Sequence, residues 1–225
     1  TLGREKEMTC VATRKSKKIM VIGGGPGGLN VAWVAAKRGH KVHIFEKRSV
    51  LGGQLLPGSI PGHKRELRSL IKFQKKRIEK FGVTCHLNHA VKATDIQNFN
   101  PDVVVLATGS QPLIPPVDGI HSSNVLTYED VLNDVPPSFK KAIIIGAGPT
   151  GLELALHLTE YGCQVSVVEM LTKIGDGLEA MTKKILLRRL KKIKVNIMNE
   201  TELIRIENSG ALVSCSDGRK MLLEA

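Results

Sequence analysis

The stretch VIGGGPGGLNVAWVAAKRGHKVHIFE, from Val21 to Glu46, decides the fold. An apolar run over residues 19–22 is typical of a buried parallel strand, and glycines follow it in the spacing G-x-G-x-x-G. The first glycine permits a tight turn, the second lets a pyrophosphate approach the backbone, and the third lets a helix pack closely on the strand. These three glycines are Gly23, Gly25 and Gly28.

The residues after the glycines complete a nucleotide-binding pattern. A helix is predicted from Pro26 to about Arg38, so that its unbonded N–H groups and its positive dipole end face the phosphates. A second strand is predicted over Lys41–Phe45. Glu46 follows it, where a carboxylate can accept hydrogen bonds from both hydroxyls of an adenosine ribose. The stretch therefore predicts a dinucleotide site, against the alternative of a glycine turn in another α/β fold.

The same pattern occurs a second time, beginning at Lys140. Residues 140–169 align with residues 17–46 at an offset of 123 without a gap. The glycines, the first helical proline and the acid all recur, as Gly146, Gly148, Pro149, Gly151 and Glu169. Two signatures with the same acid spacing are far less expected by chance than one. The chain is therefore predicted to hold two units, each binding its own adenine dinucleotide.

Length and composition bound the class of protein. The 225 residues suffice for one large or two small domains, and a hydrophobic content of 42% is that of a globular protein. No apolar run reaches the length of a membrane span, and an aromatic content of 4% argues against nucleic-acid binding by stacking. Four scattered cysteines suit reduced thiols and form no metal or redox-disulfide motif. We expect a cytoplasmic protein that binds neither membranes nor nucleic acids.

The net charge of +12 comes largely from residues 14–18, 63–80 and 183–194. Two of these segments carry apolar residues at helical spacing among the lysines and arginines. In the first these are Leu67, Leu70, Ile71, Ile78 and Phe81, and in the second Met181, Ile185, Leu190 and Ile193. The pattern predicts two amphipathic helices with solvated basic faces. The alternative is that the basic faces attract anionic cofactors or dock on an acidic partner.

The rest of the chain reads as further short elements. Strands are expected over residues 83–86, 102–106, 194–197, 203–206 and 211–215, a short strand and helix over 125–132, a loop over 57–62 and a hairpin turn over 216–219.

Two dinucleotide units, with Gly52-Gly53 after the first and Ala107-Thr108-Gly109 after the intervening strand, resemble the two-dinucleotide flavoprotein reductases. The segments LGGQL, VVLATGSQPLIPPVDGI and VVEML more specifically resemble the C-terminal half of the dienoyl-CoA reductase, NADH:flavin oxidoreductase and trimethylamine dehydrogenase group. The resemblance implies an α/β fold of two Rossmann-like three-layer domains, the second inserted in the first. We expect a leader (1–16), an FAD-binding domain (17–116) and an NAD(P)-binding domain (117–225).

The resemblance also implies the residues that bind the cofactors. FAD would contact Gly23, Gly25, Pro26, Gly27, Gly28, Glu46, Lys47, Gly53, Gln54, the backbone of Val91, Ala107, Thr108 and Gly109. NAD(P)H would contact Gly146, Gly148, Pro149, Thr150, Gly151, Glu153 and Glu169. Glu153 would lie near the nicotinamide, although an acid early in a helix is also favoured by the helix dipole alone. No other catalytic side chain is expected, because the two cofactors themselves carry hydride transfer.

The sequence also predicts which nicotinamide cofactor is preferred. Glu169 places a negative charge where the 2′-phosphate of NADPH would sit, so NADH is expected to bind more tightly. Lys173 is close enough in sequence to weaken this preference, which keeps NADPH as an alternative.

The departures from the family pattern limit what this chain can do alone. Leu55-Leu56-Pro57 stands where disulfide reductases carry a cysteine pair, so no dithiol relay is expected. The dienoyl-CoA reductase group begins with an FMN-binding barrel and a four-cysteine iron–sulfur site, and Cys10 alone cannot hold a cluster. Gly3-Arg4-Glu5 resembles the segment after the last cluster cysteine, and MLLEA at 221–225 stops before the family's returning strand. We expect a fragment that retains FAD weakly.

Three functions follow from the resemblance. The first is an enzyme module that passes a hydride from NADH to FAD, and from there to a 4Fe–4S cluster and FMN in the N-terminal barrel domain of a longer parent. The second is a non-catalytic module that binds ADP in a trimethylamine dehydrogenase-like protein. The third is a small stand-alone NADH oxidase, which the missing strand argues against. The sequence leaves the final substrate open, and homo-oligomerisation is an open alternative.

Overall fold

A computed structural model of the chain describes residues 3–4, 7, 9–133 and 136–225. Five residues of the expected leader, numbers 1, 2, 5, 6 and 8, lie outside the described residues, Glu5 among them. The chain divides into two compact units, residues 1–111 and 112–225. The predicted boundary at residue 116 lies close to this division, but the roles assigned to the two domains stay predictions.

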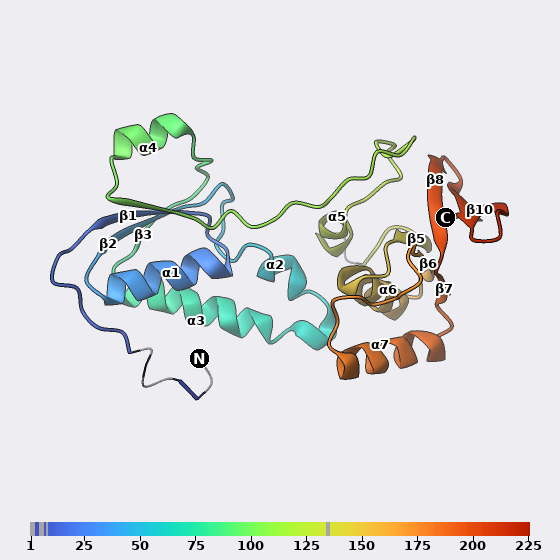
Figure 1. Cartoon of the computed structure of the whole chain (residues 1–225), viewed down its shortest axis with the longest axis horizontal. Helices are drawn as coiled ribbons and strands as arrows, with labels where there is room; N and C mark the ends of the chain where they lie inside the picture. The colour runs from blue at the N-terminus through green and yellow to red at the C-terminus, as the bar shows by residue number, and fades with distance from the viewer. Residues whose placement is uncertain (1–2, 5–6, 8, 134–135) are drawn as a thin grey trace. The chain divides into compact units, whose positions relative to one another are not determined.

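The first unit is built on a parallel sheet in the order β3-β2-β1-β4. Its strands are β1 (Lys18–Ile22), β2 (Lys41–Phe45), β3 (Thr84–His86) and β4 (Val103–Leu106). Helices α1 (Pro26–Lys37) and α3 (Leu67–Lys80) lie on one side of this sheet, and α4 (Ala93–Phe99) lies on the other (Figure 1). The unit thus has the three layers expected of a dinucleotide-binding fold.

Burial of apolar side chains between the sheet and α1 sets the position of the glycine turn. Val21, Ile44, Leu29 and Ala32 are fully buried and join β1, β2 and α1 in one core. Because β1 and α1 are both fixed by this core, the short connection between them must run tightly at the carboxyl end of β1.

The opposite face of the sheet carries a layer of aromatic and histidine rings under α4. The rings of His43 and His86 stack with centroids 5.4 Å apart, and Phe99 of α4 meets the edge of His43 at 4.9 Å. Burial lowers the pKa of His43, and the nearby His86 and Lys18 lower it further. His43 is therefore neutral at neutral pH, which suits a layer covered by an apolar ring.

The second unit combines a parallel and an antiparallel sheet. The parallel sheet has the order β5-β6-β7, and the antiparallel sheet has the order β10-β9-β8. The strands are β5 (Lys141–Ile145), β6 (Gln164–Val168), β7 (Asn196–Met198), β8 (Thr201–Glu207), β9 (Gly210–Cys215) and β10 (Lys220–Glu224), and the helices are α5 (Tyr128–Asn133), α6 (Pro149–Glu160) and α7 (Ala180–Lys192). The hairpin turn at residues 216–219 is confirmed by the hydrogen bond from Cys215 N–H to Arg219 O, at 2.9 Å.

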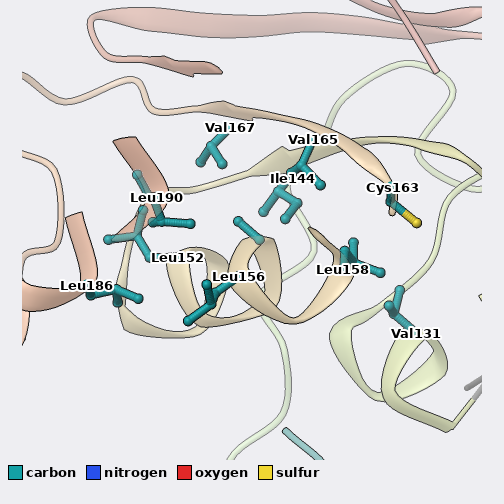
Figure 2. Packing of buried hydrophobic residues seen from close by; sticks show 12 residues of the cluster. Val131, Ile144, Leu152, Leu156, Leu158, Cys163, Val165, Val167, Leu186 and Leu190 are labelled. Carbon is teal, nitrogen blue, oxygen red and sulfur yellow. The ribbon is translucent and has the colours of Figure 1, made fainter. Parts of the chain in front are cut away.

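The core of the second unit repeats that of the first. Figure 2 shows Leu152 of α6, Val167 of β6 and Leu190 of α7 pointing toward one another, and all three side chains are fully buried. The cluster fixes α6 against β5 and β6, as the core of the first unit fixes α1 against β1 and β2. The predicted α/β class with two Rossmann-like units is confirmed, while the insertion of one domain in the other stays a prediction.

Three local predictions need correction. The loop expected over residues 57–62 begins inside a short helix, α2 (Leu55–Gly58), and the long basic helix is broken into a 3₁₀ turn (Gly62–Lys64) followed by α3. No strand forms within the described residues 125–127. Asp130 explains this, because its carboxylate accepts hydrogen bonds from the N–H and the hydroxyl of Thr127, at 2.9 and 2.6 Å, and so starts α5 there.

The apolar stripe expected on the second basic helix is also only partly buried. Leu186 and Leu190 of α7 face the core, but Met181 and Ile185 are 60% and 53% exposed. The buried face of α7 is therefore rotated from the one that the sequence spacing suggested. In the described part of the chain, no helix has both the length and the apolar character that a bilayer span requires.

Candidate functional site

The glycine turn of the first unit admits no side chain at two of its three signature positions. A Cβ built on Gly23, which has φ +111°, would lie 2.2 Å from the carbonyl oxygen of Ala107. A Cβ on Gly28 would lie 2.0 Å from the carbonyl oxygen of Gly23. The end of β4, at Ala107, therefore reaches the glycine turn directly, and both contacts involve backbone atoms that cannot move easily.

The N-terminus of α1 is open to a ligand. Gly25 is the N-cap residue and supplies no side-chain hydrogen bond, while Pro26 begins the helix with a backbone that has no N–H. A Cβ on Gly27 would meet no atom within 4 Å, so the first turn faces open space. Unbonded N–H groups and the positive end of a 12-residue helix form an anion site of the kind that phosphates occupy.

Glu46 holds this turn in place from the end of β2. One carboxylate oxygen accepts a hydrogen bond from Gly24 N–H at 2.6 Å, and the other accepts one from Arg48 N–H at 2.8 Å. The residue is only 7% exposed. A carboxylate oxygen can accept more than one hydrogen bond, so both oxygens keep capacity for ribose hydroxyls. Glu46 is thus a structural tie as well as the predicted ribose ligand.

Two further segments approach the turn. Gly53 lies against Gly25, since a Cβ on Gly53 would be 2.7 Å from Gly25 Cα, and Gly52 N–H donates to Gly24 O at 2.9 Å. His89 N–H donates to Glu46 O at 2.9 Å, which fixes the segment leading to Val91 beside the acid. The absence of side chains at Gly25 and Gly53 leaves a bare backbone cradle next to the helix N-terminus.

The second unit repeats these contacts. Glu169 accepts hydrogen bonds from Ala147 N–H at 2.8 Å and from Leu171 N–H at 2.9 Å, and Gly175 N–H donates to Ala147 O at 2.7 Å. A Cβ on Gly151 would lie 2.0 Å from Gly146 O. Each contact therefore has a counterpart of the same kind in the first unit.

Sequence reasoning missed three residue pairs in this network. They are Gly24 and Ala147, Arg48 and Leu171, and Gly52 and Gly175, and each pair is separated by the same 123 residues as the aligned stretches. The signal was available, since the offset continues beyond Glu169 as far as Gly175. Only the contacts reveal that these residues tie the turn to the acid and to the following loop.

The correspondence resumes within the basic helices α3 and α7, at a shorter offset of 112 residues. Asn88 and Glu200 both have positive φ, at 55° and 49°, and donate their N–H groups to Arg48 O and Leu171 O. The same offset pairs Ile78 with Leu190, which are both buried. The two units therefore share one design from the first strand to the end of the third.

The remaining predicted residues lie around the two turns. Thr108 and Gly109 are exposed just after β4, Gln54 caps α2, Thr150 is exposed in the first turn of α6, and Glu153 is half-buried in the same helix. Lys47 is exposed and forms no hydrogen bond or ion pair within the described part of the chain.

The two units differ at the buried residue Gln74 of α3. Its side-chain amide donates to Pro26 O, the first carbonyl of α1, at 3.0 Å, while its own oxygen is buried without a hydrogen-bond partner in the described structure. Gln74 is 5% exposed, and Leu186, at the corresponding position of α7, is 7% exposed. The first unit thus carries a polar tie between α3 and the start of α1 that the second unit replaces by an apolar contact.

The substitution Gln74→Leu is expected to raise the melting temperature and to weaken FAD binding. Leucine removes a buried unpaired oxygen, whose cost is about 1–3 kcal/mol, but it also releases the start of α1. Scanning calorimetry and an FAD titration of the same samples measure both effects. Leu186→Gln is the matched control and should lower the melting temperature without changing FAD affinity. Unchanged FAD affinity in Gln74→Leu would contradict a role of Gln74 in positioning the start of α1.

The sequence of this chain is similar to known proteins over nearly its whole length. Residues 17–225 match the family described as pyridine nucleotide-disulphide oxidoreductase. Bilirubin reductase of Mediterraneibacter gnavus is 33% identical over 220 residues, which are 98% of this chain and 34% of that protein. Cinnamate reductase of Clostridium sporogenes is 34% identical over 226 residues, which are 99% of this chain and 34% of that protein.

A solved structure gives the same result. A 2-naphthoyl-CoA reductase in complex with 2-naphthoyl-CoA is similar with a TM-score of 0.90 and 29% identity, covering 96% of this chain and 33% of that one. This chain therefore spans about a third of the length of these relatives. The predicted resemblance to the flavoprotein reductases that include dienoyl-CoA reductase is confirmed.

Proposed function

Because this chain belongs to the pyridine nucleotide-disulphide oxidoreductase family, we propose that it passes a hydride from NADH to FAD. The observation that carries the proposal is the repeated arrangement of one glycine turn, one open helix N-terminus and one doubly bonded glutamate in each unit. Two such arrangements in one chain fit two adenine dinucleotides, one at each turn.

The first unit is assigned to FAD and the second to NADH. FAD would be held at the pyrophosphate by the glycine turn and α1, at the ribose by Glu46, and along its length by Gly53, Gln54, Val91 and residues 107–109. NADH would be held by the turn at residues 146–151 and by Glu169. The bare surface formed by Gly25 and Gly53 fits an extended pyrophosphate, since a side chain at Gly53 would overlap the backbone of Gly25.

When bound, the two cofactors supply the hydride chemistry themselves. The chain's own residues bind the two cofactors and orient them. Glu46 and Glu169 accept hydrogen bonds from the riboses, and the helix N-termini of α1 and α6 hold the phosphates. Glu153, half-buried in α6, is the residue we assign to the nicotinamide side of the second site. No residue is required to donate or accept a proton in the transfer itself.

The second site is assigned to NADH in preference to NADPH. Both oxygens of Glu169 accept backbone N–H bonds, which fix the position of the carboxylate. A 2′-phosphate would then meet a fixed negative charge. Lys173 is exposed and forms no ion pair within the described residues. It therefore does not offset the negative charge of Glu169 in the described structure.

In the full-length protein this module would feed a further reaction. The relatives are about three times as long as this chain, and two are named for the reduction of bilirubin and of cinnamate. We propose a cytoplasmic parent that also carries an FMN-binding barrel and a 4Fe–4S cluster and that reduces an unsaturated substrate. The relatives' lengths support a longer parent, and the names of two of them support the reduction of such a substrate.

Anaerobic mixing of the FAD-loaded chain with NADH tests the proposed function. Reduction bleaches the flavin absorbance band at about 450 nm, whereas a nucleotide-binding module without turnover leaves the band unchanged. The alternative ADP-binding function would be favoured if the first site took up ADP but not FAD.

A further inference from the structure

The outer face of α3 carries an alternating stack of rings and cations shared with α1. The guanidinium carbon of Arg77 lies 4.9 Å from the ring centroid of Phe73 and 5.3 Å from that of Trp33. The ring of Trp33 stacks on Phe81 with centroids 6.3 Å apart, and Lys80 Nζ lies 5.9 Å from the Phe81 ring. Arg77 is therefore held between two aromatic side chains from two helices.

The charge around this stack is strongly positive. The sequence of α3, LRSLIKFQKKRIEK, contains six basic residues and one acid. Its outer cations Lys72, Lys76, Arg77 and Lys80 form no ion pair in the part of the chain that the structure describes. The apolar side chains of Leu70 and Phe73 lie among them and are 42% and 46% exposed. Cations and exposed apolar side chains that could contact a partner are thus present on the same helix.

The second unit supplies an internal comparison for this face. At the offset of 112 residues, the four cations of α3 match Lys184, Arg188, Arg189 and Lys192 of α7. Helix dipoles favour cations in the last turn, and a solvated basic face aids solubility, so these general effects explain the charges on both helices. The aromatic stack is different, because Phe73 corresponds to Ile185, and Trp33 corresponds to the buried Leu156.

The stack gives Arg77 a property that Arg189 lacks. An arginine that rests on aromatic rings loses less side-chain freedom when its N–H edge pairs with a carboxylate, and that pairing can be bidentate. Tryptophan and arginine are also the residue types most enriched at the energetic centres of protein interfaces. An exposed apolar ring beside the cation provides the contact area that a simple ion pair at a surface does not have.

We propose that the α1–α3 face, formed by Trp33, Leu70, Phe73, Arg77 and Lys80, is a docking surface for an acidic polypeptide segment supplied by a separate protein. One carboxylate of the segment pairs with Arg77, and an apolar side chain of the segment packs on Phe73 and Leu70. Because this face is strongly positive, it attracts a negatively charged segment more than any other. The surface involves none of the residues assigned to the nucleotides, so its failure would leave the proposed function untouched.

Other partners fit the face less well. A nucleic-acid base needs a free ring face, and the Trp33 ring is already in contact with Arg77 and Phe81. A membrane-surface helix needs a continuous apolar face, whereas Leu70 and Phe73 are flanked by lysines, and the main apolar face of α3 is buried in the unit.

The test uses the chain's single tryptophan, Trp33, which lies within the surface. The 225-residue chain is titrated with a synthetic peptide of about twelve residues in which pairs of glutamate alternate with leucine, while Trp33 fluorescence is followed. We expect a saturable change that weakens as salt is added. A peptide with lysine in place of glutamate should produce no change.

Matched variants locate the binding. Arg77→Ala is expected to raise the dissociation constant about tenfold, and Arg189→Ala, which removes the same charge from α7, less than about twofold. Phe73→Ser and Ile185→Ser form a second pair with the same expected contrast. Calorimetric titration measures these constants, because Arg77→Ala itself alters the surroundings of Trp33, and thermal unfolding verifies that each variant is folded.

Four results would overturn the proposal. They are no saturable binding of the acidic peptide, equal losses in Arg77→Ala and Arg189→Ala, tighter Arg77-dependent binding of a short DNA duplex, and tighter Arg77-dependent binding of phosphatidylglycerol vesicles. Equal losses in Arg77→Ala and Arg189→Ala would mean that binding depends on net charge alone. The third and fourth would assign the face to nucleic acid or to a membrane surface.

Discussion

Alanine in place of Gly28 is expected to destabilise the first unit by about 3 kcal/mol and to abolish FAD binding. The added Cβ would lie 2.0 Å from the carbonyl oxygen of Gly23 and 3.2 Å from the Cβ of Ala107. Neither neighbour is the far end of a flexible side chain, so α1 must move away from β1. That movement takes the helix N-terminus away from the phosphate position and separates the residues that form the cradle.

The neighbouring glycine provides the control. A Cβ added at Gly27 would meet no atom within 4 Å. Alanine is also a better helix former than glycine by about 0.8–1 kcal/mol. Gly27→Ala should therefore leave thermal stability unchanged or raised. Gly151→Ala, with the same 2.0 Å overlap in the second unit, should remove NADH binding and keep FAD binding. FAD affinity within about threefold of the wild type in Gly28→Ala would contradict the assignment of the first turn.

The substitution Glu169→Gln is expected to reduce the preference for NADH over NADPH by about tenfold. The amide keeps the shape of the carboxylate and one hydrogen-bond acceptor, but it carries no charge to oppose a 2′-phosphate. Its NH₂ group also cannot accept a bond from either Ala147 N–H or Leu171 N–H, so part of the affinity for NADH is lost as well. Dissociation constants for both cofactors, measured on wild type and variant, give the change directly.

Glu46→Gln serves as the matched control, since Glu46 has the same two kinds of backbone bond in the first unit. It should weaken FAD binding and leave the ratio of the NADH and NADPH constants unaltered. The account of the second site fails if the wild type binds NADPH as tightly as NADH, or if Glu169→Gln leaves the ratio where it was.

The ungapped repeat made much of the fold predictable. The first helix was predicted to run from Pro26 to about Arg38 and runs from Pro26 to Lys37, and β2 has the predicted bounds. These elements follow from local rules, since the glycine spacing, the first helical proline and the apolar strands act within about thirty residues of one another. The positions of the two acids are predictable for the same reason.

The contacts that complete the sites were not predictable in this way. Ala107 meets Gly23 only because β4 pairs with β1, and that pairing depends on the order of strands in the sheet. Gln74 was one polar residue in a basic helix, and nothing in the spacing distinguished it from its solvated neighbours. Its burial follows from the rotation of α3 on α1. That rotation also leaves Leu70 and Phe73 exposed, and tertiary packing sets it, not helical periodicity.

The central claim is that this chain moves a hydride from NADH to FAD, and one measurement tests it most directly. The chain is loaded with FAD, freed of oxygen and mixed with NADH in a stopped-flow cell, while flavin absorbance at about 450 nm is recorded. We predict bleaching with NADH, slower or weaker bleaching with NADPH, and none in Gly151→Ala, which retains FAD. A chain that holds FAD and binds NADH, yet shows no bleaching with either nucleotide, would contradict the account.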